Sequence, residues 1–295
     1  MSGVVCLDVR LYKPTPMSNS LRLHHFTHSR HGVAGRTIRV WLPPNYGADA
    51  HARFPVLYLL DGQNVFEDHA AFGGRSWRAG ETAAQLIERR TIEPVLLVAI
   101  DNSGGHRTDD YTPERWHGRG GHADDFGRML VDEIKAFVDA HYRTNPERES
   151  TAIVGSSLGG LFALHLAIER ADVFGHVAAL SPSTFWANGA VLKHLIALQS
   201  KVPVRIWIDV GKQESPSLRR QIRAAADTLR AKGWRVHRQN RQAELRHVEV
   251  ARSRHDEASW GKRLQRVLPF LFPPPPRTTK RTGLRARALK GARSD

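Results

Sequence analysis

The segment from Thr151 to Ile168 constrains the fold of this 295-residue chain more than any other. It reads TAIVGSSLGGLFALHLAI: a short apolar run, a turn of small residues and an apolar helical pattern. A G-x-S-x-G match over Gly155–Gly159 in this context is typical of a serine on a tight strand-to-helix turn, because small flanking residues let strand and helix approach closely. The five letters alone would also match a chance glycine–serine turn, so the flanking patterns give the match its meaning.

Strand-like and helix-like patterns alternate around this segment, with no linker or repeat between residues 21 and 272. The predicted strands are Thr37–Leu42, Pro55–Leu60, Pro94–Ile100, Thr151–Gly155, His176–Leu180, Val202–Val210 and Val248–Ala251. Helices are predicted over 123–142, Leu161–Ile168, Leu218–Leu229 and Trp260–Leu271, where apolar residues recur at helical spacing. This order predicts an α/β fold, with a mainly parallel central sheet and helices on both faces.

The chain is expected to have three parts. Residues 1–20 form an irregular N-terminal segment in which Met17 is a second candidate start, and residues 21–272 form the catalytic domain. Residues 273–295 begin with four prolines, which forbid helix, and continue as a basic tail that we expect to be disordered.

The net charge of +15 raises the question of nucleic acid or anionic lipid as a partner. We interpret it as an arginine-rich solvated surface, because the chain has no helix-turn-helix, zinc-finger or RRM-like motif. No specific nucleic-acid partner is therefore expected. The N-terminus lacks a signal-peptide pattern, no 18 apolar residues follow one another, and Cys6 is the single cysteine. These features predict a cytoplasmic protein without a membrane span or an intramolecular disulfide.

Ser157 needs a base and an orienting carboxylate, because a serine hydroxyl attacks only when its proton is taken up. On the fold predicted here the acid precedes the histidine, and both follow the serine. His255 lies between the last predicted strand and the last predicted helix, where the base belongs. Two acids remain open: Asp209 at the end of a predicted strand, and Glu214 in the loop beyond it. We favour Glu214, because a loop carboxylate reaches a histidine more easily.

Two backbone N–H groups are expected to hold the negative charge that develops on an attacked carbonyl oxygen. The N–H of Leu158 opens the helix after Ser157. The N–H of Gln63 follows a glycine turn at the end of an apolar strand, although an ordinary turn would read the same.

Four histidines, at positions 24, 25, 28 and 31, form a candidate zinc or nickel site. No acidic or cysteine partner accompanies them, and they fall in a predicted edge strand away from the catalytic loops. We therefore expect no metal site and no cofactor.

Six separated motifs carry a resemblance to a known family: VLYLLDGQNVF, DNSGGHRTDDYTP, VGSSLGGL, LSPSTFW, DVGKQES and HDEASW. Over roughly residues 35–272 the chain resembles the putative esterase family, which includes esterase D-like, feruloyl and siderophore trilactone esterases. The resemblance implies an α/β-hydrolase fold, no cofactor, and a triad at Ser157, Glu214 and His255. It also implies substrate contacts from Asp101, Arg107, Tyr111, Phe185 and Trp186.

Together these observations predict a serine esterase that hydrolyses a small-molecule carboxylic ester through an acyl-enzyme. Two alternatives stay open. The same triad could transfer the acyl group to an alcohol instead of water, or the chain could be a basic binding protein on a hydrolase scaffold. The complete triad argues against the second alternative. The pattern leaves the oligomeric state open.

Overall fold

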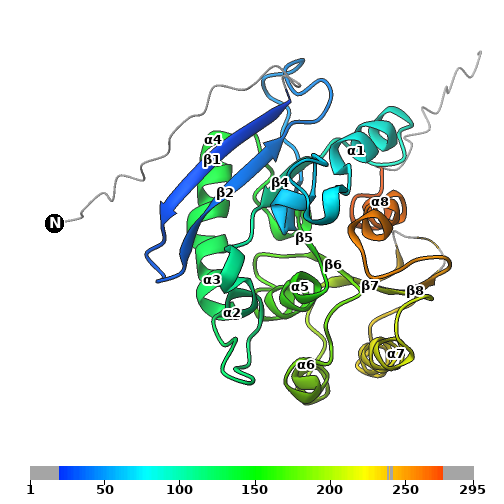
Figure 1. Ribbon diagram of the computed structural model, residues 1–295. Coiled ribbons are helices and arrows are strands. Elements are labelled where there is room, and N and C mark those ends of the chain that lie inside the picture. The colour runs from blue at the N-terminus through cyan, green and yellow to red at the C-terminus, as the bar shows by residue number, and fades with distance from the viewer. Residues whose placement is uncertain (1–19, 238, 240–241, 275–295) are drawn as a thin grey trace, which may run out of the picture.

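The apolar runs of the sequence form one eight-stranded sheet in a computed structural model that describes residues 20–237, 239 and 242–274. The strand order is β1-β2-β4-β3-β5-β6-β7-β8 (Figure 1). Pairing is antiparallel from β1 to β2 and from β2 to β4, and parallel from β4 onward. The strands are β1 (Leu21–His28), β2 (Ala34–Trp41), β3 (Val56–Leu60), β4 (Leu96–Ile100), β5 (Thr151–Ser156), β6 (His176–Leu180), β7 (Arg205–Gly211) and β8 (Leu245–Val250). The predicted mainly parallel sheet is confirmed.

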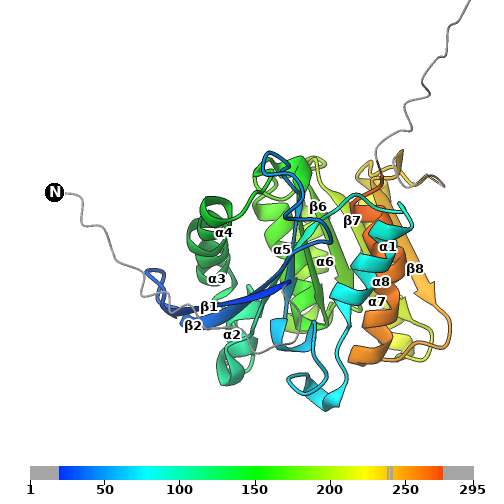
Figure 2. The same cartoon turned by 90° about the horizontal axis from the view of Figure 1, so that it is seen from above.

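Helices cover both faces of the sheet, and each face has its own hydrophobic core (Figure 2). Residues of α1 and α8 pack with alternate strand residues, such as Leu57 and Val154, on one face. Residues of α3, α4, α5, α6 and α7 pack with the intervening ones, such as Tyr58 and Ile153, on the other. The helices are α1 (Ala79–Glu88), α2 (Arg107–Tyr111), α3 (Ala123–Met129), α4 (Ala136–His141), α5 (Leu158–Glu169), α6 (Trp186–Ala197), α7 (Pro216–Ala231) and α8 (Glu257–Leu271).

The structure extends several predicted elements and adds others. The helix predicted over 123–142 is interrupted by a π-helical turn, Leu130–Lys135, between α3 and α4. Helices α1, α2 and α6 were not predicted. The histidine-rich segment does form the edge strand β1. The expectations for residues 1–19 and 275–295, including Cys6, Met17 and most of the basic tail, lie outside the described residues. Within the described part of the chain, no helix has the length and apolar character needed to cross a membrane.

Gly155, near the end of β5, lets the strand and α5 approach as closely as the motif requires. A Cβ at this position would lie 2.3 Å from the carbonyl oxygen of Gly159 and 2.4 Å from its carbonyl carbon. Both atoms belong to the backbone of the first turn of α5, so they cannot move aside independently. Only glycine fits between these two elements.

We expect Gly155→Ala to destabilise the protein strongly, because the new methyl group overpacks a backbone contact. Overpacking lowers the free energy of unfolding by about 1 to 3 kcal/mol, which corresponds to a melting temperature roughly 3 to 10 °C lower for a domain of this size. Gly47→Ala is the matched control, since a Cβ there meets no atom within 4 Å. Thermal unfolding of the two variants tests this, and an unchanged melting temperature for Gly155→Ala would contradict it.

Candidate active site

Three predicted site residues lie at one edge of the sheet. Ser157 directly follows β5, Glu214 follows β7, and His255 follows β8. Because β5 to β8 are parallel, their carboxyl ends meet at the same edge. Open α/β sheets bind ligands outside this edge. The structure therefore brings together three residues that are spread over about a third of the chain.

Ser157 occupies a backbone conformation that an L-residue rarely adopts, with φ 56° and ψ −121°. Two hydrogen bonds hold it there: the Ser157 N–H donates to Leu180 O at 3.0 Å, and the Ser183 N–H donates to Ser157 O at 3.0 Å. Strained residues persist where the surrounding structure fixes them, and they are common at functional sites. The turn is the sharp strand-to-helix elbow expected from the motif.

A continuous hydrogen-bonded chain joins the three side chains. His255 Nε2 lies 2.9 Å from Ser157 Oγ, and His255 Nδ1 lies 2.7 Å from Glu214 Oε2. An ionised carboxylate only accepts hydrogen bonds, so Nδ1 carries the hydrogen and Nε2 is left to accept from the serine hydroxyl. The edge of the Trp260 ring packs against the imidazole, with 4.8 Å between ring centroids. This geometry is suited to removing the proton of Ser157.

The carboxylate of Glu214 is held in its ionised form. Burial alone would raise its pKa, but hydrogen bonds from His255, Ser181 and the Gly211 N–H lower the pKa to about 2. Two donors to Oε1 lie at short distances: Ser181 Oγ at 2.6 Å and the Gly211 N–H at 2.7 Å. Oε1 is thereby fixed, and Oε2 is presented to His255.

Asp209, the other candidate acid, points away from the histidine into the protein interior. Its carboxylate is fully buried and accepts hydrogen bonds from Arg263 Nη1 at 2.6 Å and Trp207 Nε1 at 2.9 Å. Burial raises the pKa of Asp209, and the charge of Arg263 opposes that rise. The hydrogen bonds of Asp209 connect it to Arg263, Trp207 and Ser181, whereas those of Glu214 include His255.

The two candidate oxyanion donors lie at the starts of helical turns. Leu158 is the first residue of α5, and Gln63 lies within the 3₁₀ turn Gly62–Asn64. The first backbone N–H groups of a helix have no acceptor inside it, so they are available to a ligand. The Gln63 side chain accepts a hydrogen bond from the Asn102 N–H at 3.2 Å, which ties this turn to the loop after β4.

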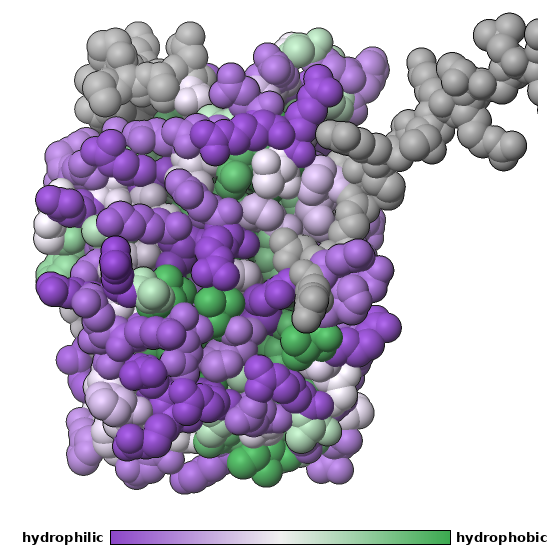
Figure 3. All heavy atoms as spheres, turned by 90° about the vertical axis from the view of Figure 1, so that its right-hand side faces the viewer, coloured by the Kyte–Doolittle hydropathy of each residue, from purple (hydrophilic) through white to green (hydrophobic). Residues whose placement is uncertain are grey.

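A cavity of about 710 Å³ opens in front of Ser157. Its walls come from the loops after β3 and β4, the segment before α1, and the start of α8. The lining residues are Asp61, Gln63, Asn64, Phe72, Gly73, Arg75, Asn102, Arg107, Ser156, Ser157, His255, Asp256, Glu257, Ala258 and Trp260. Phe72 is 82% exposed, so the aromatic ring stands at the solvent side of this wall. On the side of the molecule that lies to the right in Figure 1, hydrophilic side chains prevail and apolar ones form small patches (Figure 3).

Among the predicted substrate contacts, Arg107 lines the cavity and Tyr111 does not. Arg107 donates two hydrogen bonds to the carboxylate of Asp61, at 2.6 and 2.8 Å. Tyr111 is completely buried, and its ring packs in a cluster with the rings of Phe126 and Phe162. The Tyr111 hydroxyl accepts a hydrogen bond from the Asp61 N–H, so this side chain supports the loop after β3 and does not line the cavity.

The other three predicted contacts also lie outside the cavity lining. The carboxylate of Asp101 is occupied by Arg39, with both hydrogen bonds at 2.9 Å. Phe185 is 47% exposed, and Trp186 donates from Nε1 to Glu114 O at 2.7 Å. Phe185 and Trp186 follow Ser183, whose Oγ lies 3.2 Å from Ser157 Oγ, so they belong to a segment that contacts the nucleophile, although neither lines this cavity.

Glu257 is a cavity residue that sequence reasoning missed, although it lies within the HDEASW motif. Its carboxylate accepts hydrogen bonds from Asn64 Nδ2, at 3.0 Å, and from Trp77 Nε1. It therefore ties the loop of His255 to the turn that contains Gln63. Burial raises the pKa of Glu257 to about 7, with a smaller contribution from Asp61, while Trp77, Arg107 and His255 oppose the rise.

This shift predicts a pH-dependent stability. The ordinary pKa of Glu257 is 4.5, so the folded protein binds this proton more tightly than the unfolded chain does. The resulting stabilisation is complete below about pH 4.5 and is lost as the pH rises through about 7. We compare the melting temperature of Glu257→Gln with that of wild type at pH 5 and at pH 8. The difference, variant minus wild type, should be larger at pH 8 than at pH 5. Glu88→Gln, at an exposed position of α1, should show no such trend, and a parallel pH dependence of Glu257→Gln and wild type would contradict the prediction.

The histidines of β1 and His31, which lies in the turn after it, do not converge on a common point. His24 is buried, with Nε2 2.6 Å from the Tyr142 hydroxyl, whereas His25 Nδ1 lies 2.9 Å from Thr37 Oγ1. His31 Nε2 lies 3.2 Å from Asp132. In residues 20–274, apart from the three left undescribed, no group of three or more histidine, cysteine or acidic side chains is arranged to hold a metal ion.

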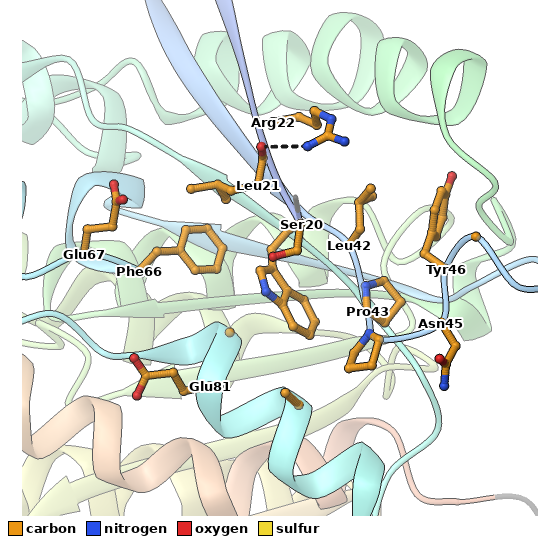
Figure 4. Close-up of a pocket in the computed structure, with 15 residues that line it drawn as sticks. Ser20, Leu21, Arg22, Leu42, Pro43, Asn45, Tyr46, Phe66, Glu67 and Glu81 are labelled. Atoms are coloured by element: carbon orange, nitrogen blue, oxygen red, sulfur yellow. Dashed lines mark hydrogen bonds between the residues drawn. The ribbon is translucent and has the colours of Figure 1, made fainter. Parts of the chain in front are cut away.

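A second cavity, of about 950 Å³, lies between the ends of β1 and β2 and helix α1 (Figure 4). Aromatic and proline side chains surround it, and Glu67 and Glu81 lie on the side opposite Asn45 and Tyr46. None of Ser157, Glu214 and His255 lines it. The larger cavity is therefore separate from the hydrogen-bonded chain.

Comparison with known proteins identifies the family of the chain. Residues 34–271 match the sequence model of the family described as "Putative esterase". Ferri-bacillibactin esterase BesA of Bacillus subtilis (strain 168) is 29% identical over 203 residues, which are 61% of this chain and 66% of BesA. The crystal structure of the BES protein from Bacillus cereus superposes with a TM-score of 0.68 at 19% identity, over 89% of this chain and 98% of that one.

The enterobactin esterase FES from Shigella flexneri, solved in the presence of enterobactin, has a TM-score of 0.69 at 21% identity. The match covers 85% of this chain and 58% of FES, so this chain spans little more than half of that relative. The family match, by contrast, extends from β2 to the end of α8. The chain belongs to the putative esterase family, and it is a carboxylic ester hydrolase with the α/β-hydrolase fold.

Proposed function

We propose that the protein is a serine esterase that hydrolyses a small-molecule ester through an acyl-enzyme, with Ser157 as nucleophile, His255 as base and Glu214 as orienting acid. The observation that carries the proposal is the unbroken chain from Ser157 Oγ to His255 (2.9 Å) and on to Glu214 (2.7 Å). It joins an elbow serine to a histidine whose second nitrogen is fixed by an ionised carboxylate. These are the three parts that nucleophilic catalysis by serine requires.

In the first half-reaction, Ser157 Oγ attacks the ester carbonyl carbon while His255 Nε2 takes the hydroxyl proton. The carbonyl π electrons move to oxygen, and the N–H groups of Leu158 and Gln63 stabilise that negative charge. Glu214 stabilises the imidazolium that forms. The tetrahedral intermediate then collapses, and His255 returns the proton to the departing alcohol.

In the second half-reaction, water attacks the acyl-enzyme carbonyl and gives a proton to His255. The new tetrahedral intermediate expels Ser157 Oγ, which recovers its proton, and the carboxylic acid leaves. Each step moves one proton between the nucleophile or leaving group and Nε2, so the triad itself is unchanged after a turnover.

The substrate is proposed to be a compact ester that reaches Ser157 through the cavity of about 710 Å³. Known relatives carry the names ferri-bacillibactin esterase and enterobactin esterase, and a ferulic acid esterase shares the fold. We therefore place siderophore trilactones and feruloyl esters beside simple acyl esters as candidates. The polar lining, with Asp61, Arg107 and Glu257, favours a substrate with hydrogen-bonding groups.

A panel of short p-nitrophenyl esters, a feruloyl ester and a siderophore trilactone tests this proposal. We expect hydrolysis of at least one member, together with a pre-steady-state burst of p-nitrophenol whose amplitude approaches one per chain when deacylation is slow. Mass spectrometry of the quenched enzyme should place the acyl group on the peptide that contains Ser157. An acyl group trapped on another residue, or hydrolysis that shows no dependence on Ser157, would overturn the mechanism.

A further inference from the structure

Arg263, in the second turn of α8, is a buried cation immediately behind the proposed triad acid. Only 2% of the residue is exposed. It projects from the same helix as Trp260 and Leu264, both of which belong to the hydrophobic core on that face. A charge in such a position is costly unless it is paired and fully hydrogen-bonded.

The guanidinium of Arg263 bridges two buried carboxylates. Nη1 donates to Asp209 Oδ1 at 2.6 Å, and Nη2 donates to Glu214 Oε1 at 3.2 Å. The remaining donors reach Ser181 Oγ at 2.8 Å, and Ser253 Oγ at 2.8 and 3.1 Å. Glu214 Oε1, which faces away from His255, is therefore held by Arg263 as well as by Ser181 and Gly211.

The charges of this cluster balance only when the histidine is protonated. Asp209 and Glu214 carry two negative charges against the single positive charge of Arg263. A neutral His255 leaves one negative charge in the buried cluster, and an imidazolium cancels it. General-base catalysis produces that imidazolium as the proton leaves Ser157, so the cluster is electrostatically matched to the state formed during attack.

We propose that Arg263 and Asp209 act together as a positioning pair, which aims Glu214 Oε2 at His255 and sets how readily His255 accepts a proton. The inference rests on the triad assigned above, and it adds two residues that touch neither substrate nor Ser157. Removing the cation leaves two unbalanced carboxylates and favours the imidazolium. Removing Asp209 leaves Arg263 and Glu214 with one positive and one negative charge, which already cancel while His255 is neutral, so the imidazolium is disfavoured.

Other charged groups also face His255 and must be kept constant. Glu257, Asp61 and Arg107 face it across the cavity, and Arg254 and Asp256 adjoin it in the chain. None of them is altered in the variants below. A change in the pH dependence of kcat/KM among those variants can then be assigned to the buried cluster of Arg263, Asp209 and Glu214.

The test is the pH profile of kcat/KM for a neutral p-nitrophenyl ester, whose acidic limb reports protonation of the base in the free enzyme. For Arg263→Gln we expect the acidic limb to move to higher pH, and for Asp209→Asn to lower pH, each by about one pH unit. The double variant Asp209→Asn/Arg263→Gln replaces the ion pair with two neutral amides. It should return the acidic limb to within about 0.3 pH unit of wild type.

Arg263→Lys separates charge from geometry, because lysine keeps the positive charge but cannot form the same fork of hydrogen bonds. It should leave the acidic limb in place and lower kcat by about tenfold or more, with KM little changed. Arg266→Gln, at an exposed position of the same helix, is the control for loss of a positive charge and should match wild type. Circular dichroism establishes that each variant is folded.

Opposite displacements of the two single variants would support the proposal. Folded single variants whose acidic limbs coincide with wild type would overturn it and leave the pair a purely structural ion pair. If Arg263→Gln does not fold, Asp209→Asn and the double variant decide by the same criterion. If neither single variant folds, a displaced acidic limb in Arg263→Lys would overturn the proposal, and an unmoved limb with reduced kcat would support it. Failure of the triad itself is distinguishable, because activity would then persist without Ser157.

Discussion

Replacing Ser157 with alanine is expected to lower kcat for ester hydrolysis by about 10⁴- to 10⁶-fold. The variant retains the cavity, His255 and the two proposed oxyanion donors, so it should still bind substrate and catalyse about 10³-fold or more above the rate in water. It has no atom that can form the acyl-enzyme. Labelling by a fluorophosphonate probe should therefore disappear along with turnover.

Ser183→Ala is the matched control for this experiment. Ser183 Oγ lies 3.2 Å from Ser157 Oγ, but Ser183 is buried, and its backbone is not at the elbow. Loss of one hydrogen bond to the nucleophile should cost no more than about tenfold in kcat. Probe labelling retained by Ser157→Ala and lost by Ser183→Ala would mean that the nucleophile has been assigned to the wrong serine.

Glu214→Gln should lower kcat by several orders of magnitude, about 10⁴-fold in comparable triads. An amide cannot balance the imidazolium, and it can present an N–H to His255 Nδ1, which favours the wrong tautomer. The same change at Asp209 should cost clearly less, because the carboxylate of Asp209 is bonded to Arg263 and Trp207. Steady-state kinetics on both variants, with the fold checked by circular dichroism, measure the difference.

The comparison has two informative failures. If Glu214→Gln stays within about tenfold of wild type while folded Asp209→Asn is inactive, the two acids exchange roles. If both variants stay active, Ser157 and His255 work as a dyad. The structure makes the first outcome difficult to reach, because Asp209 would have to leave a fully buried ion pair with Arg263 before it could approach the imidazole.

Much of the fold could be predicted because strands buried on both faces must be apolar throughout. That condition made Pro94–Ile100 visible as an uninterrupted apolar run, and Thr151–Gly155 and His176–Leu180 as runs with one polar residue at the start. Helix α6 gave no such signal, since it opens with three residues in the left-handed region, at 187–189, and has few buried side chains. The π-helical turn at Leu130–Lys135 adds a residue to one turn, which apolar periodicity does not reveal.

The site residues also differ in how far the sequence could predict them. Ser157, Glu214 and His255 could be nominated because each must follow a strand at the same edge of the sheet, which is a matter of chain order. Tyr111 and Asp101 were nominated by resemblance, and the structure gives them other partners: aromatic rings for Tyr111, and Arg39 for Asp101. Arg263 could not be found, because its partner Asp209 lies 54 residues away and a charged residue on an amphipathic helix is ordinarily read as exposed.

The position of β8 leads us to expect a particular route by which this enzyme loses activity on heating. β8 is the last strand in the sheet order, and its described pairing is with β7 alone, yet the loop that follows it carries His255. Proteins open locally at free energies well below that of global unfolding, and sheet edges with few neighbours are among the first parts to fray. A brief detachment of this edge would carry the base out of reach of Ser157 while β3, β4 and β5 stay paired. The working half-life on heating is then governed by one peripheral strand, and stiffening β8 should prolong it more than further packing of the centre.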